Sequence, residues 1–68
     1  MNKNLLTKRE YEILALMVEG QSNVEISKNL SISISSVKAY CRSIFEKLHV
    51  NNRVKAVVKA IYIGLIWL

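Results

Sequence analysis

Apolar residues recur every three or four positions along most of the chain, a spacing that places them on one face of an α-helix. Four stretches show this pattern, and we expect helices over about residues 8–19, 24–30, 34–48 and 53–63. The apolar face of the third stretch consists of Val37, Cys41, Ile44 and Leu48. The second stretch is too short to be a stable helix alone, so all four must pack together. The pattern therefore predicts an all-α, four-helix fold.

Polar residues mark the starts of these helices. The segments Thr7–Glu10 and Ser22–Glu25 have the spacing of capping boxes, in which a hydroxyl and a glutamate each bond a free amide. Ser33 is placed to cap the third helix, and either Asn51 or Asn52 to cap the fourth. These signals fix where each helix should begin.

The ends of the first two helices are also indicated. Gly20 suits the left-handed position that follows a helix, so it should end the first one. In the short second helix, either Val24 or Ile26 would face the core together with Leu30. Ile32, between two serines, would anchor the turn to the core.

On a face next to its apolar face, the third helix carries Lys38 and Arg42 one turn apart, with only the small Ala39 beside them. A short helix followed by a turn and a helix with exposed cations is a helix-turn-helix unit, whose second helix enters the major groove of DNA. The alternative interpretation is an ordinary surface helix with solvated charges.

Composition narrows the possible partners. The 68 residues are enough for one domain, 1–68, with residues 1–5 as an arm and 65–68 as an apolar tail. The chain has ten Lys and Arg residues, five Glu and no Asp, which gives a net charge of +5. This excess predicts attraction to a polyanion, either nucleic acid or anionic lipid.

Few residues are available for other chemistry. Cys41 is the single cysteine, so it forms no internal disulfide, and its place on an apolar face predicts a buried thiol in a reducing cytoplasm. Cys41 and His49 are too few for a zinc site, and no catalytic cluster is present. We therefore expect no enzyme activity, cofactor or metal. The apolar run at 60–68 is too short to span a membrane, and the start does not resemble a signal peptide.

The fourth helix has more apolar surface than one buried face requires. The residues expected to point outward are Val54, Val58, Ile61 and Tyr62. Either the tail, with Trp67 as its anchor, folds back over this surface, or a partner covers it.

Residues at many positions follow one known pattern in order and without gaps. They are 6–14, Gly20, 22–26, Leu30, 32–33, 37–38, 44–45, 47–48, Val50, Arg53, 56–57, Ala60 and 64–66. In these residues the chain resembles the LuxR-type helix-turn-helix domain of bacterial regulators, which includes the GerE group. The resemblance covers about residues 6 to 66.

This resemblance implies roles for individual residues. The base-facing positions are Lys38, Ala39 and Arg42. The phosphate-contacting positions are Ser22, Asn23, Ser36 and Lys47. The resemblance also suggests an ion pair between Glu10 and Arg53, and a dimer formed through the fourth helix.

The chain departs from the family pattern at three positions. Tyr40 stands where His is usual, and its ring or hydroxyl would contact the DNA backbone instead. His49 stands where Gly is common, so a left-handed conformation there costs more, or the turn differs. Ala39 has no hydrogen-bonding side chain, which leaves most of the direct base readout to Lys38 and Arg42.

We therefore expect a cytoplasmic, bacterial, sequence-specific transcription regulator, either free-standing or the output domain of a larger protein. It would bind double-stranded DNA as a homodimer on an inverted repeat, with RNA polymerase as a further partner and no membrane contact. One alternative is a protein-interaction module of the transcription machinery, similar to a sigma-factor domain. The other is a small cationic membrane-active peptide.

Overall fold

The computed structural model describes residues 5–66, and within them it contains four helices and no strand. The helices are α1 (Lys8–Val18), α2 (Asn23–Leu30), α3 (Ile34–Leu48) and α4 (Arg53–Tyr62). The prediction of an all-α, four-helix fold is confirmed, and each helix begins and ends within one residue of its expected bounds.

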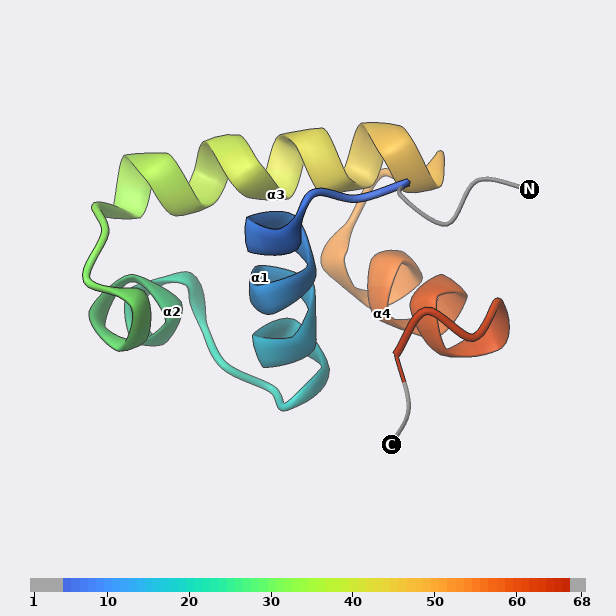
Figure 1. The fold of residues 1–68 in the computed structure, drawn as a ribbon, viewed down its shortest axis with the longest axis horizontal. Coiled ribbons are helices and arrows are strands. Elements are labelled where there is room, and N and C mark those ends of the chain that lie inside the picture. The colour runs from blue at the N-terminus through green and yellow to red at the C-terminus, as the bar shows by residue number, and fades with distance from the viewer. Residues whose placement is uncertain (1–4, 67–68) are drawn as a thin grey trace.

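The longest helix, α3, connects the other three. It contacts α1, α2 and α4, all of which lie on one side of it (Figure 1). In the same view α2 lies beneath the first half of α3, and α4 beneath its second half. One long side of α3 is therefore left uncovered by the rest of the described chain.

The core forms where the apolar faces meet under α3. Its largest fully buried side chains are Ile13, Leu14, Ile26, Val37, Ile44 and Leu48. The predicted inner face of α3 is confirmed, since Cys41 is buried as well. In α2 the buried apolar residue is Ile26, while Val24 is exposed. Burial of each large apolar side chain stabilises the fold by about 1.5–3 kcal/mol.

Both predicted capping boxes are present. The Thr7 hydroxyl accepts from the Glu10 amide at 3.1 Å, and the Glu10 carboxylate accepts from the Thr7 amide at 2.8 Å. Ser22 and Glu25 repeat the arrangement at 3.1 and 2.8 Å. The two boxes differ in burial, since Glu10 is buried and Glu25 is exposed. Because it is buried under α3, the Glu10 carboxylate can also bond side chains of that helix.

The remaining helix starts are capped by single side chains. Ser33 accepts from the amide of Ser36 at 3.0 Å and begins α3. Of the two candidate asparagines, Asn52 caps α4, because its Oδ1 accepts from the amide of Lys55 at 2.9 Å. The turn between α3 and α4 therefore includes Asn51.

All four helices are followed by a residue in the left-handed region, and two of these residues, Gly20 and Gly64, are glycines. Gly20, with a φ of 88°, follows α1 as predicted. Ser31 and His49 end α2 and α3 with φ values of 57° and 58°. A side chain in this conformation costs about 1–2 kcal/mol. His49 thus adopts the left-handed conformation that glycine would adopt more easily.

The described part of the tail packs beside α4 without covering its outer face. The Leu65 amide donates to the Ala60 carbonyl at 2.8 Å, and Leu65 and Ile66 are half-buried against the core. Val54, Val58 and Tyr62 nevertheless stay 71%, 60% and 87% exposed. Trp67, the expected anchor, lies outside the described residues. Across residues 5–66, no helix combines the length and apolar character required to cross a bilayer.

Candidate nucleic-acid interface

The uncovered side of α3 carries a row of exposed residues. Lys38, Ala39 and Arg42 are all exposed, on the side opposite the buried face of the helix. We call these three residues the α3 row. Glu46, one turn beyond Arg42, is exposed on the same side and adds a negative charge at the far end. The α3 row is therefore a cationic, convex surface that ends at an acid.

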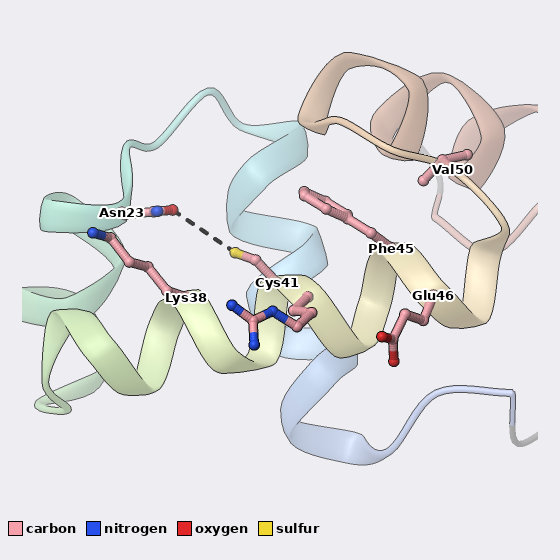
Figure 2. Close-up of a pocket in the computed structure, with 7 residues that line it drawn as sticks. Asn23, Lys38, Cys41, Phe45, Glu46 and Val50 are labelled. Carbon is pink, nitrogen blue, oxygen red and sulfur yellow. Dashed lines mark hydrogen bonds between the residues drawn. The ribbon is translucent and has the colours of Figure 1, made fainter.

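A groove of about 360 Å³ runs along one edge of the α3 row (Figure 2). Lys38 and Arg42 stand at its rim, while Cys41, Phe45 and Val50 supply apolar walls. Asn23, the first residue of α2, closes the end beside Lys38. The groove thus brings the start of α2, predicted to contact phosphate, next to Lys38, which is predicted to face the bases.

The other edge of the α3 row has a second hollow. Ser36, Ala39, Tyr40 and Ser43 line it, and Glu10 of α1 lies beneath. Tyr40 is half-buried against the core, so part of its ring is fixed and part faces this hollow. The predicted backbone-contacting residues Ser36 and Tyr40 therefore lie on one side of the row, with Asn23 on the other.

Beneath the second hollow, Glu10, Ser43 and Lys47 form a hydrogen-bonded group that we call the Glu10 cluster. The Ser43 hydroxyl donates to Glu10 Oε2 at 2.5 Å, and Lys47 Nζ pairs with Oε1 at 2.9 Å. Burial raises the pKa of Glu10, but the bonds from Ser43, Lys47 and the Thr7 amide outweigh it and lower this pKa from 4.5 to about 2. The carboxylate is therefore ionised at neutral pH.

The expected ion pair between Glu10 and Arg53 is wrong. Lys47 pairs with the Glu10 carboxylate instead, because its side chain extends from α3 to the start of α1. Arg53, at the start of α4, points instead to α2 and the loop before it: its Nη1 donates to the Gln21 carbonyl at 3.0 Å, and its Nη2 donates to Asn23 Oδ1. The two cations therefore join different helices, since Lys47 connects α3 to α1 and Arg53 connects α4 to the start of α2.

Asn23, Arg53 and Cys41 form a second polar group, the Asn23 cluster. The Cys41 thiol also donates to Asn23 Oδ1, at 3.8 Å (Figure 2). Burial raises the pKa of Cys41, although the positive charge of Arg53 opposes this, so the thiol is protonated at neutral pH. Because both donors use Oδ1, the Asn23 Nδ2 group lies on the other side of the amide.

The other predicted phosphate contacts occupy helix starts or the edge of α3. Ser22 is exposed, with its hydroxyl used in capping α2. Ser36 accepts from the Ser33 hydroxyl at 3.0 Å. Lys47 is half-buried and keeps 36% of its side chain exposed beside Glu10. All three have polar atoms at the surface near the α3 row or the start of α2.

A separate apolar surface lies on α4. Val54, Val58 and Tyr62 follow one another at intervals of one turn and line a shallow groove, with Lys55 and Lys59 at its sides. Ile61 is less exposed, at 37%. The residues predicted to form a dimer therefore share one open face, flanked by two cations. Residues 5–66 contain no group of three potential metal-binding side chains.

Three residues in or beside the candidate nucleic-acid interface were not predicted as site residues from the sequence: Ser43, Glu46 and Arg53. Ser43 and Glu46 lie in the predicted third helix, and helical spacing places Glu46 on the side of the α3 row. The position of Arg53 had no such signal, since one of its partners is a main-chain carbonyl.

A capped short helix, a tight turn and a longer helix with an exposed cationic row define a helix-turn-helix domain. The chain belongs to the luxR family of bacterial regulatory proteins, whose model matches residues 4–60. This membership confirms the resemblance noted from the sequence, and the relatives below are regulators of transcription, not enzymes.

Two curated relatives illustrate the similarity. The chain is 49% identical over 55 residues to the transcriptional regulatory protein LiaR of Bacillus subtilis (strain 168), covering 81% of this chain. It is 44% identical over 61 residues to the transcriptional regulatory protein DegU of Brevibacillus brevis, covering 90%. The match spans only 26% of the length of each relative.

Solved structures agree with this membership. The transcription factor GerE superposes with a TM-score of 0.83 at 35% identity, covering 91% of this chain and 92% of that one. The response regulator ChrA of a heme-sensing two-component system gives a TM-score of 0.89 at 36% identity, covering 97% of this chain and 33% of that one. The four-helix arrangement is thus that of the helix-turn-helix domain of the family.

Proposed function

We propose that this chain is a sequence-specific DNA-binding module that acts on transcription by inserting α3 into the major groove. The observation that carries this proposal is the α3 row, three exposed residues on the side of α3 that the rest of the described chain leaves uncovered. The module is either free-standing or the output domain of a longer regulator, and it acts in the bacterial cytoplasm, at the nucleoid.

Direct readout falls to the α3 row. A major groove about 12 Å wide accepts an α-helix, and Lys or Arg pairs with guanine O6 and N7 there. Ala39 has no donor or acceptor, so it suits a thymine methyl group. Lys38 and Arg42 are one turn apart and read neighbouring base pairs, while Glu46 lies where the helix leaves the groove.

Backbone contacts supply much of the affinity. Ser22 and Asn23 lie at the start of α2, and Ser36, Lys47 and the ring of Tyr40 lie along the other edge of α3. These residues flank the α3 row on two sides, the arrangement needed to contact the strands that border a groove. A net charge of +5 supports a steep salt dependence of binding.

Tight binding requires two copies, because one module makes few base contacts. The exposed face of Val54, Val58, Ile61 and Tyr62 supports a homodimer formed through α4. A two-fold dimer would bind an inverted repeat, with its two α3 helices in successive major grooves.

Selection of binding sites from random duplexes, followed by fluorescence anisotropy, tests the DNA proposal. Arg42→Ala should cost about 1–3 kcal/mol on the selected site and relax its base preference, while Lys47→Ala should weaken all duplexes alike. Lys28→Ala, which removes a charge at the far end of α2, is the control and should change little. An equal loss for Arg42→Ala on selected and random duplexes would remove Arg42 from base readout.

Sedimentation tests the dimer. Val58→Glu should abolish self-association because it places an unpaired charge in the apolar face, while the circular dichroism spectrum stays that of the folded monomer. Val24→Glu, at an exposed valine of α2, is the matched control and should leave self-association unchanged. A wild-type protein that stays monomeric at high micromolar concentration, with and without DNA, would contradict the dimer.

The apolar face of α4 supports a second candidate, contact with RNA polymerase, as in a sigma-factor-like module. The two candidates separate on one measurement, which is binding to duplex DNA without polymerase present. Salt-dependent binding by the chain alone supports the DNA module.

A further inference from the structure

Arg53 is a half-buried cation whose hydrogen-bond partners are neutral. Within residues 5–66 the ion pairs are Arg9 with Glu12 and Lys47 with Glu10, and no carboxylate lies within ion-pair distance of Arg53. Its guanidinium instead donates to the Gln21 carbonyl and to Asn23 Oδ1. The positive charge of this guanidinium is therefore not compensated by a carboxylate of the described chain.

This charge does not favour the helix beside which it lies. Asn23 is the first residue of α2, and the positive end of a helix dipole is at its N-terminus, where cations are unfavourable. The two hydrogen bonds must therefore offset a repulsion. The bond to Asn23 Oδ1 also holds the side chain of Asn23 in one orientation.

Asn23 is fixed from two directions. Arg53 reaches it from α4, and the Cys41 thiol reaches it from α3, both through Oδ1. The other amide atom, the donor Nδ2, is thereby directed away from both. Asn23 also lines the groove beside Lys38 and Arg42, with Glu46 on the same groove, so its side-chain amide is part of the surface flanking the α3 row (Figure 2).

We infer that Arg53 is a positioning residue of the DNA interface: it orients the Asn23 amide to donate to a backbone phosphate of duplex DNA, and its own charge attracts that phosphate. This inference rests on the proposed DNA binding. It assigns to Arg53 a role at the surface of α2, although Arg53 belongs to α4.

The experiment compares the salt dependence of duplex binding for the wild type, Arg53→Gln, Arg53→Lys, Asn23→Ala and the double variant Asn23→Ala/Arg53→Lys, with circular dichroism to verify folding. Arg53→Gln should lower the affinity for selected and random duplexes about tenfold and reduce the slope of log K against log salt by about 0.9, the value for one phosphate. Arg53→Lys keeps the charge and should keep the slope, while losing about three- to fivefold in affinity as one of the two hydrogen bonds is lost.

The double variant separates positioning from a general structural role. If Arg53 acts through Asn23, Arg53→Lys should cost less than about twofold once Asn23 is alanine. Lys28→Gln, an exposed cation at the other end of α2, is the matched control and should leave the slope unchanged.

Two results would overturn the inference: wild-type affinity and slope in Arg53→Gln, or additive losses in the double variant. If Arg53→Gln does not fold, the comparison of Arg53→Lys with and without Asn23→Ala decides. A wild-type protein without salt-dependent DNA binding would instead refute the proposed function itself.

Discussion

Two polar clusters connect α3 to its neighbours, and they differ in whether the charged group has a partner of opposite charge. The Glu10 cluster joins α1 to the second half of α3 and places a buried carboxylate against a lysine. The Asn23 cluster joins α2 and α4 to the middle of α3 and places an arginine against neutral oxygens. Both clusters lie beneath the edges of the α3 row.

The difference indicates what each cluster is suited to do. A buried carboxylate needs a compensating charge and hydrogen bonds, and Glu10 has both, so its cluster stabilises the fold. A guanidinium without a nearby acid adds little to stability but attracts anions from outside. We therefore expect loss of the Glu10 carboxylate to affect unfolding and acid sensitivity, and changes in the Asn23 cluster to affect DNA binding.

The largest effect is expected from Glu10→Ala. This change removes the capping bond to Thr7, the acceptor of Ser43 and the partner of Lys47, so the free energy of unfolding should fall by about 2–4 kcal/mol. Glu25→Ala is the matched control, because Glu25 has the same place in the other capping box but is exposed. It should cost only about 0.5–1 kcal/mol. Urea unfolding measures both, and equal losses would contradict the special role of the Glu10 cluster.

The second-largest effect is expected on the loss of folding stability at low pH. The pKa of Glu10 is about 2 in the folded state, below its ordinary value of 4.5, so its contribution is complete above that ordinary value and is lost as the pH falls toward 2. Between about pH 5 and pH 2, the wild type should lose about 1–3 kcal/mol more stability than Glu10→Gln. Urea unfolding across this range measures the difference, and parallel pH profiles would refute the assignment.

Among the changes within the two clusters, the smallest effect on stability is expected from Arg53→Lys. Losing one of two hydrogen bonds to neutral oxygens should cost about 0.5–1.5 kcal/mol. Because no carboxylate of the described chain pairs with Arg53, this cost should be the same at about pH 7 and pH 3. A cost that disappears in acid would reveal an acidic partner and remove the contrast between the clusters.

Local signals predicted most of the fold. The third helix was expected over 34–48 and runs over those residues, because its capping serine and its apolar spacing agree. Val24 and Ile26 were equivalent by spacing, and only the packing of α2 against α3 selects Ile26.

The site was harder to predict where partners are distant in sequence. Glu10 and Lys47 are 37 positions apart, and the angle at which α1 meets α3 decides which cation reaches the carboxylate. Arg53 donates to a backbone carbonyl 32 positions away, and because every residue carries that acceptor, the residue type of the partner gives no signal in the sequence. The base-facing and phosphate-facing roles stay predictions until binding is measured.

The exposure of Ala39 bears on how the DNA-sequence preference of such a regulator can change in evolution. The position is exposed on the uncovered side of α3, so a longer side chain there meets solvent and disturbs no packed neighbour in the core. In the proposed complex, this is where a single codon change adds a new hydrogen-bonding group toward the bases at little cost to the fold. A duplicated copy of the gene thus has an open route to a different set of operators.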